Sequence, residues 1–90
     1  MRGSYELRVD PSAHKSIQRF PERLACAVAA FITGPLLDNP HRVGAPLRRE
    51  LLGYHAARVG VLRVVYRILE DEQQVRVVRI AHRADVYRPR

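Results

Sequence analysis

Three strand-like segments follow one another in the second half of the chain, and this pattern restricts the fold more than any other feature. They cover residues 53–58, 62–69 and 75–81, and the middle segment is rich in β-branched residues. Residues 60–61 and the polar run 70–73 are the only connections between them. Because strands joined by such short turns pair with each other, we expect a three-stranded antiparallel meander.

The first half of the chain predicts one strand and a pair of helices. Apolar and charged residues alternate over residues 5–9, which is typical of a strand. Asp10 is a good N-cap and Pro11 suits the first helical position, so a helix begins there. Pro21 ends this helix and begins a second one, which ends at residues 34–35, Gly-Pro. Two helices with so short a break should form an antiparallel hairpin.

The predicted order is β-α-α-β-β-β, an α+β fold in which the helix hairpin packs on one face of a twisted, mainly antiparallel sheet. Residues 36–47, between the helices and the meander, are expected to be irregular. We expect a single domain over residues 1–90, because a chain of this length is too short for two. The hydrophobic fraction of 47% is enough for a core and excludes a disordered basic tail.

The chain carries a large excess of positive charge. There are 16 Lys and Arg residues against 9 Asp and Glu residues, a net charge of +7 with neutral histidines. Such a potential attracts polyanions, of which nucleic acid is the commonest and an acidic protein segment the next. Lys15 is the only lysine. Codon bias in a GC-rich genome explains that ratio, but it does not explain the positive surplus.

The longest apolar run, residues 24–32, is too short to span a membrane, and the N-terminus has no signal-peptide pattern. We therefore expect a cytoplasmic protein with no membrane partner.

Several kinds of chemistry are excluded by what the sequence lacks. One cysteine cannot form an internal disulfide framework or a cysteine zinc site. There is no glycine-rich phosphate loop and no serine in a nucleophile-elbow setting. The histidines show no metal-ligand spacing: His14, His41, His55 and His82. We expect no metal and no cofactor. Arginine, histidine and tyrosine remain, and they suit cleavage of RNA by its own 2′-hydroxyl, which needs only alignment, cations and proton transfer.

The strand period predicts where the arginines lie. Arg63 and Arg67 share one face of their strand. The other face should meet the helices through Leu62, Val64, Tyr66 and Ile68. Arg76 and Arg79 fall on opposite faces of an ideal strand, so one of them must lie near an edge or a bulge. We expect the meander to bring Arg58 and Arg63 together on one surface, with Arg79 as a third candidate. The alternative is a solvated sheet face whose arginines only keep the protein soluble.

Residues 82–88 combine an imidazole, a phenol and two guanidiniums in one short run. His82 can exchange a proton near neutral pH, and Tyr87 can donate to a phosphate or stack on a base. Asp85 could orient Arg83 or an imidazole. The alternative is a short terminal helix in which Val86 and Tyr87 pack on the sheet.

Three motifs together resemble the RelE/ParE toxin superfamily, over residues 5–88. Residues 46–53 read PLRRELLG, residues 58–66 read RVGVLRVVY, and residues 82–87 read HRADVY. Their order and spacing are similar to those of the family, whose fold has the β-α-α-β-β-β order predicted above.

The resemblance implies a toxin of a type II toxin–antitoxin pair. RelE-like members are ribosome-dependent mRNA endonucleases, so we expect a metal-independent endoribonuclease that inhibits translation. The implied partners are a RelB-type antitoxin, mRNA in the ribosomal A site, and the ribosome with its 16S rRNA. The alternatives are a ParE-like, non-enzymatic inhibitor of DNA gyrase and an inactive RNA-binding relative.

The resemblance also implies roles for individual residues. Arg63 matches the arginine at the scissile phosphate, Tyr87 the tyrosine that stacks on the substrate, and His82 and Arg83 a further basic catalytic group. The expected substrate-binding residues are Arg58, His55, Arg67 and Arg79. The chain departs from the best-known branch at residues 54–57, Tyr-His-Ala-Ala, where that branch has lysines, and at position 62, which is leucine. We expect the general base to be His55 or His82, and the leaving group to be assisted by His82 or Tyr87.

Overall fold

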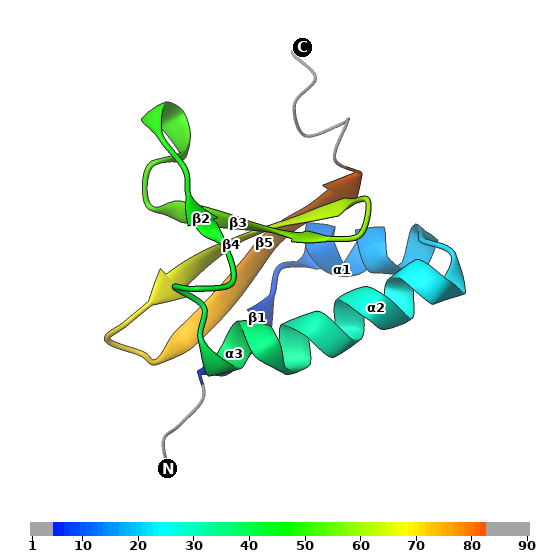
Figure 1. Ribbon diagram of the computed structural model, residues 1–90, viewed down its shortest axis with the longest axis horizontal. Helices are drawn as coiled ribbons and strands as arrows, with labels where there is room; N and C mark the ends of the chain where they lie inside the picture. Colours follow the sequence, from blue (N-terminus) through cyan, green and yellow to red (C-terminus); the bar gives the residue numbers. More distant parts are fainter. Residues whose placement is uncertain (1–4, 83–90) are drawn as a thin grey trace.

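A five-stranded sheet is the centre of the structure, a computed structural model that describes residues 5–82 (Figure 1). The strands are β1 (Glu6–Val9), β2 (Ala45–Pro46), β3 (Tyr54–Val59), β4 (Leu62–Leu69) and β5 (Gln74–His82). They are arranged in the order β1-β5-β4-β3-β2. The antiparallel meander of β3, β4 and β5 is confirmed. β1 lies at the edge and pairs with β5 in parallel, which makes the sheet mixed.

Three helices lie along one side of this sheet (Figure 1). They are α1 (Pro11–Arg19), α2 (Glu22–Thr33) and α3 (Pro35–Asp38). Each contributes buried residues to one core with the strands: Ala13 from α1, Val28 and Ile32 from α2, and Leu36 from α3. The α+β fold with a helix pair on one face of the sheet is therefore confirmed. None of the helices in the described residues is long and apolar enough to cross a membrane.

The expectation of an irregular segment over residues 36–47 is wrong in two places. One turn of helix, α3, continues to Asp38, and β2 pairs with β3 through Ala45 opposite Ala56. Both elements are too short to produce a recognisable period in sequence. They exist because tertiary contacts hold them: Leu36 is fully buried, and β2 is paired with the edge of the meander.

β5 contains a bulge that decides which way its arginines face. The pairing register with β4 shifts between Val65 and Tyr66, because β5 has one extra residue there, Val78. The residues of β5 that belong to the core are buried on both sides of the shift: Val75, Val77 and Ile80. Arg76 and Arg79 therefore share the opposite face of the sheet. The expected irregularity is confirmed as a bulge, and it places the two arginines on the same face of the sheet.

Tyr66 fixes the segment that leads into β2. Its ring is fully buried, and its hydroxyl donates a hydrogen bond to the backbone oxygen of Pro40 at 2.6 Å. Burial raises the pKa of Tyr66 to about 12. Gly44 passes so close that a Cβ there would lie 2.4 Å from the Tyr66 hydroxyl and 2.7 Å from the oxygen of Ala56. Only glycine allows this approach, which brings residues 43–47 against β3.

Candidate functional site

The sheet face away from the helices carries a group of arginines on neighbouring strands. The ladder places Arg58 of β3 directly opposite Arg63 of β4. Arg79 of β5 lies opposite Val65, two residues further along the same face of β4. The expectation that Arg58, Arg63 and Arg79 gather on one surface is thus confirmed. We call this surface the arginine face.

Arg58 and Arg63 line a cleft of about 410 Å³. Its other walls come from the segment before β3 and from β3 itself: Val43, Gly44, Ala45, Leu47, Ala56 and Ala57. Most of these side chains are small, which leaves room beside the two guanidiniums. Like charges placed directly opposite in a sheet repel each other, and a bound anion would remove that penalty. The arrangement suits an anionic group with an apolar part.

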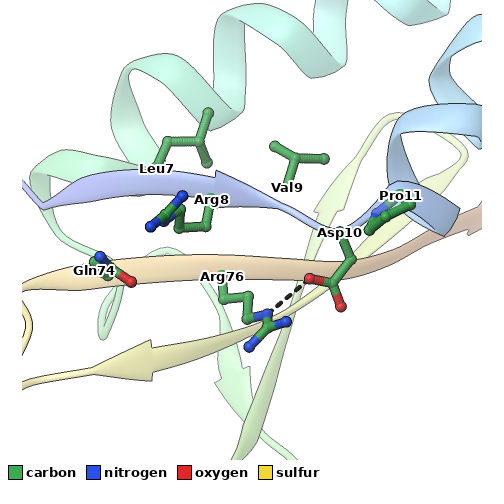
Figure 2. Close-up of a pocket in the computed structure, with 7 residues that line it drawn as sticks. All are labelled: Leu7, Arg8, Val9, Asp10, Pro11, Gln74 and Arg76. Atoms are coloured by element: carbon green, nitrogen blue, oxygen red, sulfur yellow. Dashed lines mark hydrogen bonds and ion pairs between the residues drawn. The ribbon is translucent and has the colours of Figure 1, made fainter.

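A second basic group lies farther along the same face. Arg67 of β4 is opposite Arg76 of β5, and Arg76 is in register with Arg8 of β1. The Arg67 guanidinium lies over the ring of Tyr54, 5.5 Å from its centroid. Arg76 donates from Nε to Oδ1 of Asp10 at 2.7 Å, and this hydrogen bond raises the pKa of Arg76 (Figure 2).

His55 lies on the other face of the sheet. It pairs with Tyr66 and stacks on its ring, with centroids 5.6 Å apart. The edge of the His41 ring approaches it from the α3–β2 loop. Burial, and then the charge of His41, lowers the pKa of His55. The structure does not bring His55 to the arginines, because the strand alternates and the neighbouring Ala56 takes the position on the arginine face.

His82 is the last residue of β5, and its side chain is exposed. It stands opposite Leu62, and so on the helix face of the sheet, next to Ala81, which is the register partner of Arg63. Arg83 and Tyr87, expected as catalytic residues, lie outside the described residues. Within residues 5–82 the structure contains no group of three or more His, Cys, Asp and Glu residues that could hold a metal ion.

Two groups of residues were not anticipated from the sequence. One is the edge group of Arg8, Asp10 and Arg76, which depends on the parallel pairing of β1 with β5. The alternation over residues 5–9 predicts which face of the strand carries Arg8, but it does not predict which strand lies beside it. The other is a contact between distant loops, in which Glu70 accepts hydrogen bonds from His41 and, at 3.0 Å, from Tyr5. Both hydrogen bonds lower the pKa of Glu70.

Comparison with known proteins decides the family. A sequence model described as "ParE toxin of type II toxin-antitoxin system, parDE" matches residues 7–87. The chain belongs to the RelE/ParE toxin superfamily. Within it, the chain is 45% identical over 84 residues to "Toxin RelE" of Mycobacterium tuberculosis strain H37Rv, covering 93% of this chain and 87% of that protein. It is 43% identical over 84 residues to "Toxin RelG" of the same organism, covering 93% of this chain and 97% of that protein.

Solved structures of the superfamily have the same fold. A chain of the toxin–antitoxin complex RelBE2 from Mycobacterium tuberculosis superimposes with a TM-score of 0.86 at 40% identity, covering 90% of this chain and all 100% of that one. A chain of the intact E. coli RelBE complex superimposes with a TM-score of 0.73 at 17% identity, covering 88% and 96%. The expected RelE-like fold is confirmed, and the protein is a RelE-like toxin.

Proposed function

We propose that this toxin is an endoribonuclease that cleaves mRNA on the ribosome by attack of the substrate's own 2′-hydroxyl. The observation that carries the proposal is the cleft in which Arg58 and Arg63 face each other. Two opposed guanidiniums beside a space for an apolar group match a phosphate with an attached nucleoside. The reaction needs no protein nucleophile and no metal, because the attacking oxygen belongs to the RNA.

The chemistry divides between cations and proton carriers. As the 2′-oxygen attacks phosphorus, negative charge develops on the non-bridging oxygens, and Arg63 with Arg58 stabilises it. A base removes the 2′-hydroxyl proton, and an acid protonates the departing 5′-oxygen. The products are a 2′,3′-cyclic phosphate and a free 5′-hydroxyl. Arg83 adds a further cation, and Arg67 and Arg79 bind the flanking RNA.

His82 and Tyr87 are the proposed proton carriers. His82 ends β5 next to the residue that pairs with Arg63; its register partner Leu62 lies on the helix face, but the His82 side chain is exposed at this end of the sheet. Tyr87 is assigned through the resemblance alone. His55 is less suited to act as the base, since its ring is stacked on Tyr66 on the helix side and its lowered pKa weakens it as a proton acceptor.

The small cleft explains why a ribosome would be needed. Two cations and a short apolar wall can bind a phosphate but offer little to read a base sequence. A ribosome that presents mRNA in its A site, with contacts from 16S rRNA, would supply the alignment that dominates such catalysis. This mechanism also implies a cytoplasmic location.

The second proposed partner is a RelB-type antitoxin encoded with the toxin. The mycobacterial and E. coli structures that share this fold are toxin–antitoxin complexes. A net charge of +7 favours an acidic partner segment.

Primer extension on mRNA in a translating extract tests the proposal. Cuts at fixed codon positions with wild-type protein, absent when translation is blocked, are the expected result. If the mRNA stays intact while DNA breaks appear that depend on gyrase, the ParE-like alternative replaces the nuclease. RNA binding without either effect would identify an inactive RNA-binding relative.

A further inference from the structure

We propose that the β1–β5 edge of the arginine face is a second phosphate-binding site, which holds the RNA backbone at a distance from the Arg58–Arg63 cleft. The inference rests on the proposed function, since it takes RNA as the ligand. It assigns a role to Arg8 and Arg76, which the cleavage chemistry does not use. We call these two residues, with Arg67, the edge row.

The edge row is continuous across three neighbouring strands. Arg8 of β1 is in register with Arg76 of β5, and Arg76 is directly opposite Arg67 of β4. Residues in register share a face of the sheet, so all three guanidiniums lie on the arginine face. A single carboxylate, Asp10, pairs with this row in the part of the chain that the structure describes. Glu6 also lies on this face, two positions before Arg8, but forms no ion pair with the row, so three positive charges against two negative charges leave a local surplus of one.

This surplus has an energetic cost that a ligand would offset. Like charges directly opposite in an antiparallel pair are destabilising, and Arg67 and Arg76 form one such pair, with Arg8 beside Arg76 on the parallel neighbour. The Arg8 side chain is exposed and makes no hydrogen bond or ion pair with another residue in the range 5–82. Arg76 bonds to Asp10 through Nε, and a guanidinium has further N–H donors on its two terminal nitrogens.

The edge is also hollowed. A pocket of about 500 Å³ is lined by Leu7, Arg8, Val9, Asp10, Pro11, Gln74 and Arg76. Figure 2 shows that its polar side chains come from both β1 and β5, with Arg76 reaching toward Asp10 at the end of β1. Gln74 stands two positions before Arg76 and so shares its face. Two guanidiniums and an amide are donors suited to phosphate oxygens.

The position of the pocket fits an RNA strand that leaves the cleavage cleft. Arg63 and Arg67 are four residues apart on β4, or about 13 Å along the strand. From β4 to β1 the distance is two strand spacings, about 10 Å. Arg8 and Arg76 therefore lie a few nucleotides from the cleft, and Arg67 and Arg79 lie between these two residues and the cleft. This continuity favours RNA over an acidic peptide as the ligand.

The test measures binding of 2′-O-methyl RNA, which cannot be cleaved by its own 2′-oxygen, by fluorescence anisotropy over a range of salt concentrations. Arg8→Gln/Arg76→Gln should weaken binding of a long oligonucleotide. It should also reduce the slope of log affinity against log salt by about 0.7 for each phosphate that the variant no longer neutralises. A short oligonucleotide that fills only the cleft should bind the variant and the wild type equally. Arg19→Gln/Arg23→Gln, two exposed arginines of α1 and α2, is the charge-matched control.

A second variant should have the opposite effect on RNA binding. Asp10→Asn removes the carboxylate from the edge row, while asparagine remains a good N-cap for α1. It should bind the long oligonucleotide several-fold more tightly than wild type. Arg8→Gln alone serves if the double variant does not fold, because Arg8 makes no polar interaction within residues 5–82 that the substitution would break.

The proposal is overturned if the edge variants match wild type with the long RNA, or if the helix control weakens binding as much. It is also overturned if only the affinity for a purified antitoxin changes, which would make the edge a protein-binding surface. Cleavage in the translating extract is scored separately. If wild type fails to cleave but the edge variants change the salt slope, the nuclease proposal fails and the edge site stands.

Discussion

Arg58 and Arg63 face each other directly across the β3–β4 ladder, on the side of the sheet that the helices leave open. A sheet optimised for stability alone would place a carboxylate at one of these positions, because opposed like charges repel. An anion bound between the two guanidiniums would relieve this repulsion, so the arrangement favours anion binding. Removing either arginine should therefore weaken the binding of an anion in the cleft.

Arg63→Gln should slow mRNA cleavage by about 100- to 1000-fold, the usual effect of removing one group that stabilises a developing charge. Denaturant unfolding should show that the variant remains folded, so that the lower rate reflects the loss of the cation. Arg19→Gln on α1, which removes the same charge away from the cleft, should leave the cleavage rate unchanged. Full toxicity of Arg63→Gln would contradict the assignment of the cleft.

Tyr66→Phe should destabilise the fold by about 1 to 3 kcal/mol, because it leaves the buried backbone oxygen of Pro40 without its hydrogen-bond donor. Urea unfolding of wild type and variant measures the difference. The ring itself stays in place, so the packing with His55 is retained. A change below the error of the measurement would show that another donor reaches Pro40.

Gly44→Ala should destabilise the segment before β3, because the new Cβ would meet both the Tyr66 hydroxyl and the backbone oxygen of Ala56. The Tyr66→Phe background removes only the first of these clashes. The double variant should therefore recover only part of the stability, since backbone cannot move aside as a side chain can. Full recovery in urea unfolding would show that Ala56 imposes no constraint.

The fold was largely predictable because its signals are local. Residues 62–69 have the expected bounds, and β3 and β5 differ from prediction by one residue at each end. Prolines and glycine mark both ends of α2. α3 and β2 could not be predicted, since their few residues are held by burial and pairing with distant parts of the chain. The parallel pairing of β1 with β5 depends on the tertiary structure, and no local sequence pattern predicts it.

The positions of the arginines in the candidate site could be predicted from the sequence, but the residues that form the rest of the cleft could not. Strand alternation places Arg58 and Arg63 correctly, because both belong to one hairpin with a short turn. The same rule, applied to His55, puts it on the face opposite to Arg58. His55 was predicted as a site residue for a different reason: it is a histidine in the segment where the best-known branch of the family has lysines. The cleft wall formed by residues 43–47 requires the approach of Gly44 to β3, which sequence spacing does not reveal.

Stability should fall as the pH drops below the ordinary histidine pKa of 6.5, because His55 is held neutral in the folded protein. Its folded pKa lies below 6.5, so the unfolded chain binds the proton more readily and acid favours unfolding. The destabilisation should continue until the pH passes the folded pKa. His55→Phe keeps an aromatic ring on Tyr66 and removes the titration, so its stability should depend less on pH in this window. An unchanged pH profile would place the titration elsewhere.

The two candidate bases can be separated by substitution. Register with Tyr66 and Leu62 places both histidines on the helix side of the sheet, but His55 is stacked on Tyr66 and has a lowered pKa, whereas His82 is exposed at the end of β5, beside the residue that pairs with Arg63. His55→Gln should therefore leave the rate of mRNA cleavage within a few-fold of wild type, and His82→Gln should lower it about 100-fold or more. The rates are compared as a function of pH, because removal of a proton carrier also removes one limb of the profile. If His55→Gln abolishes cleavage while the protein remains folded, His55 and not His82 is the general base.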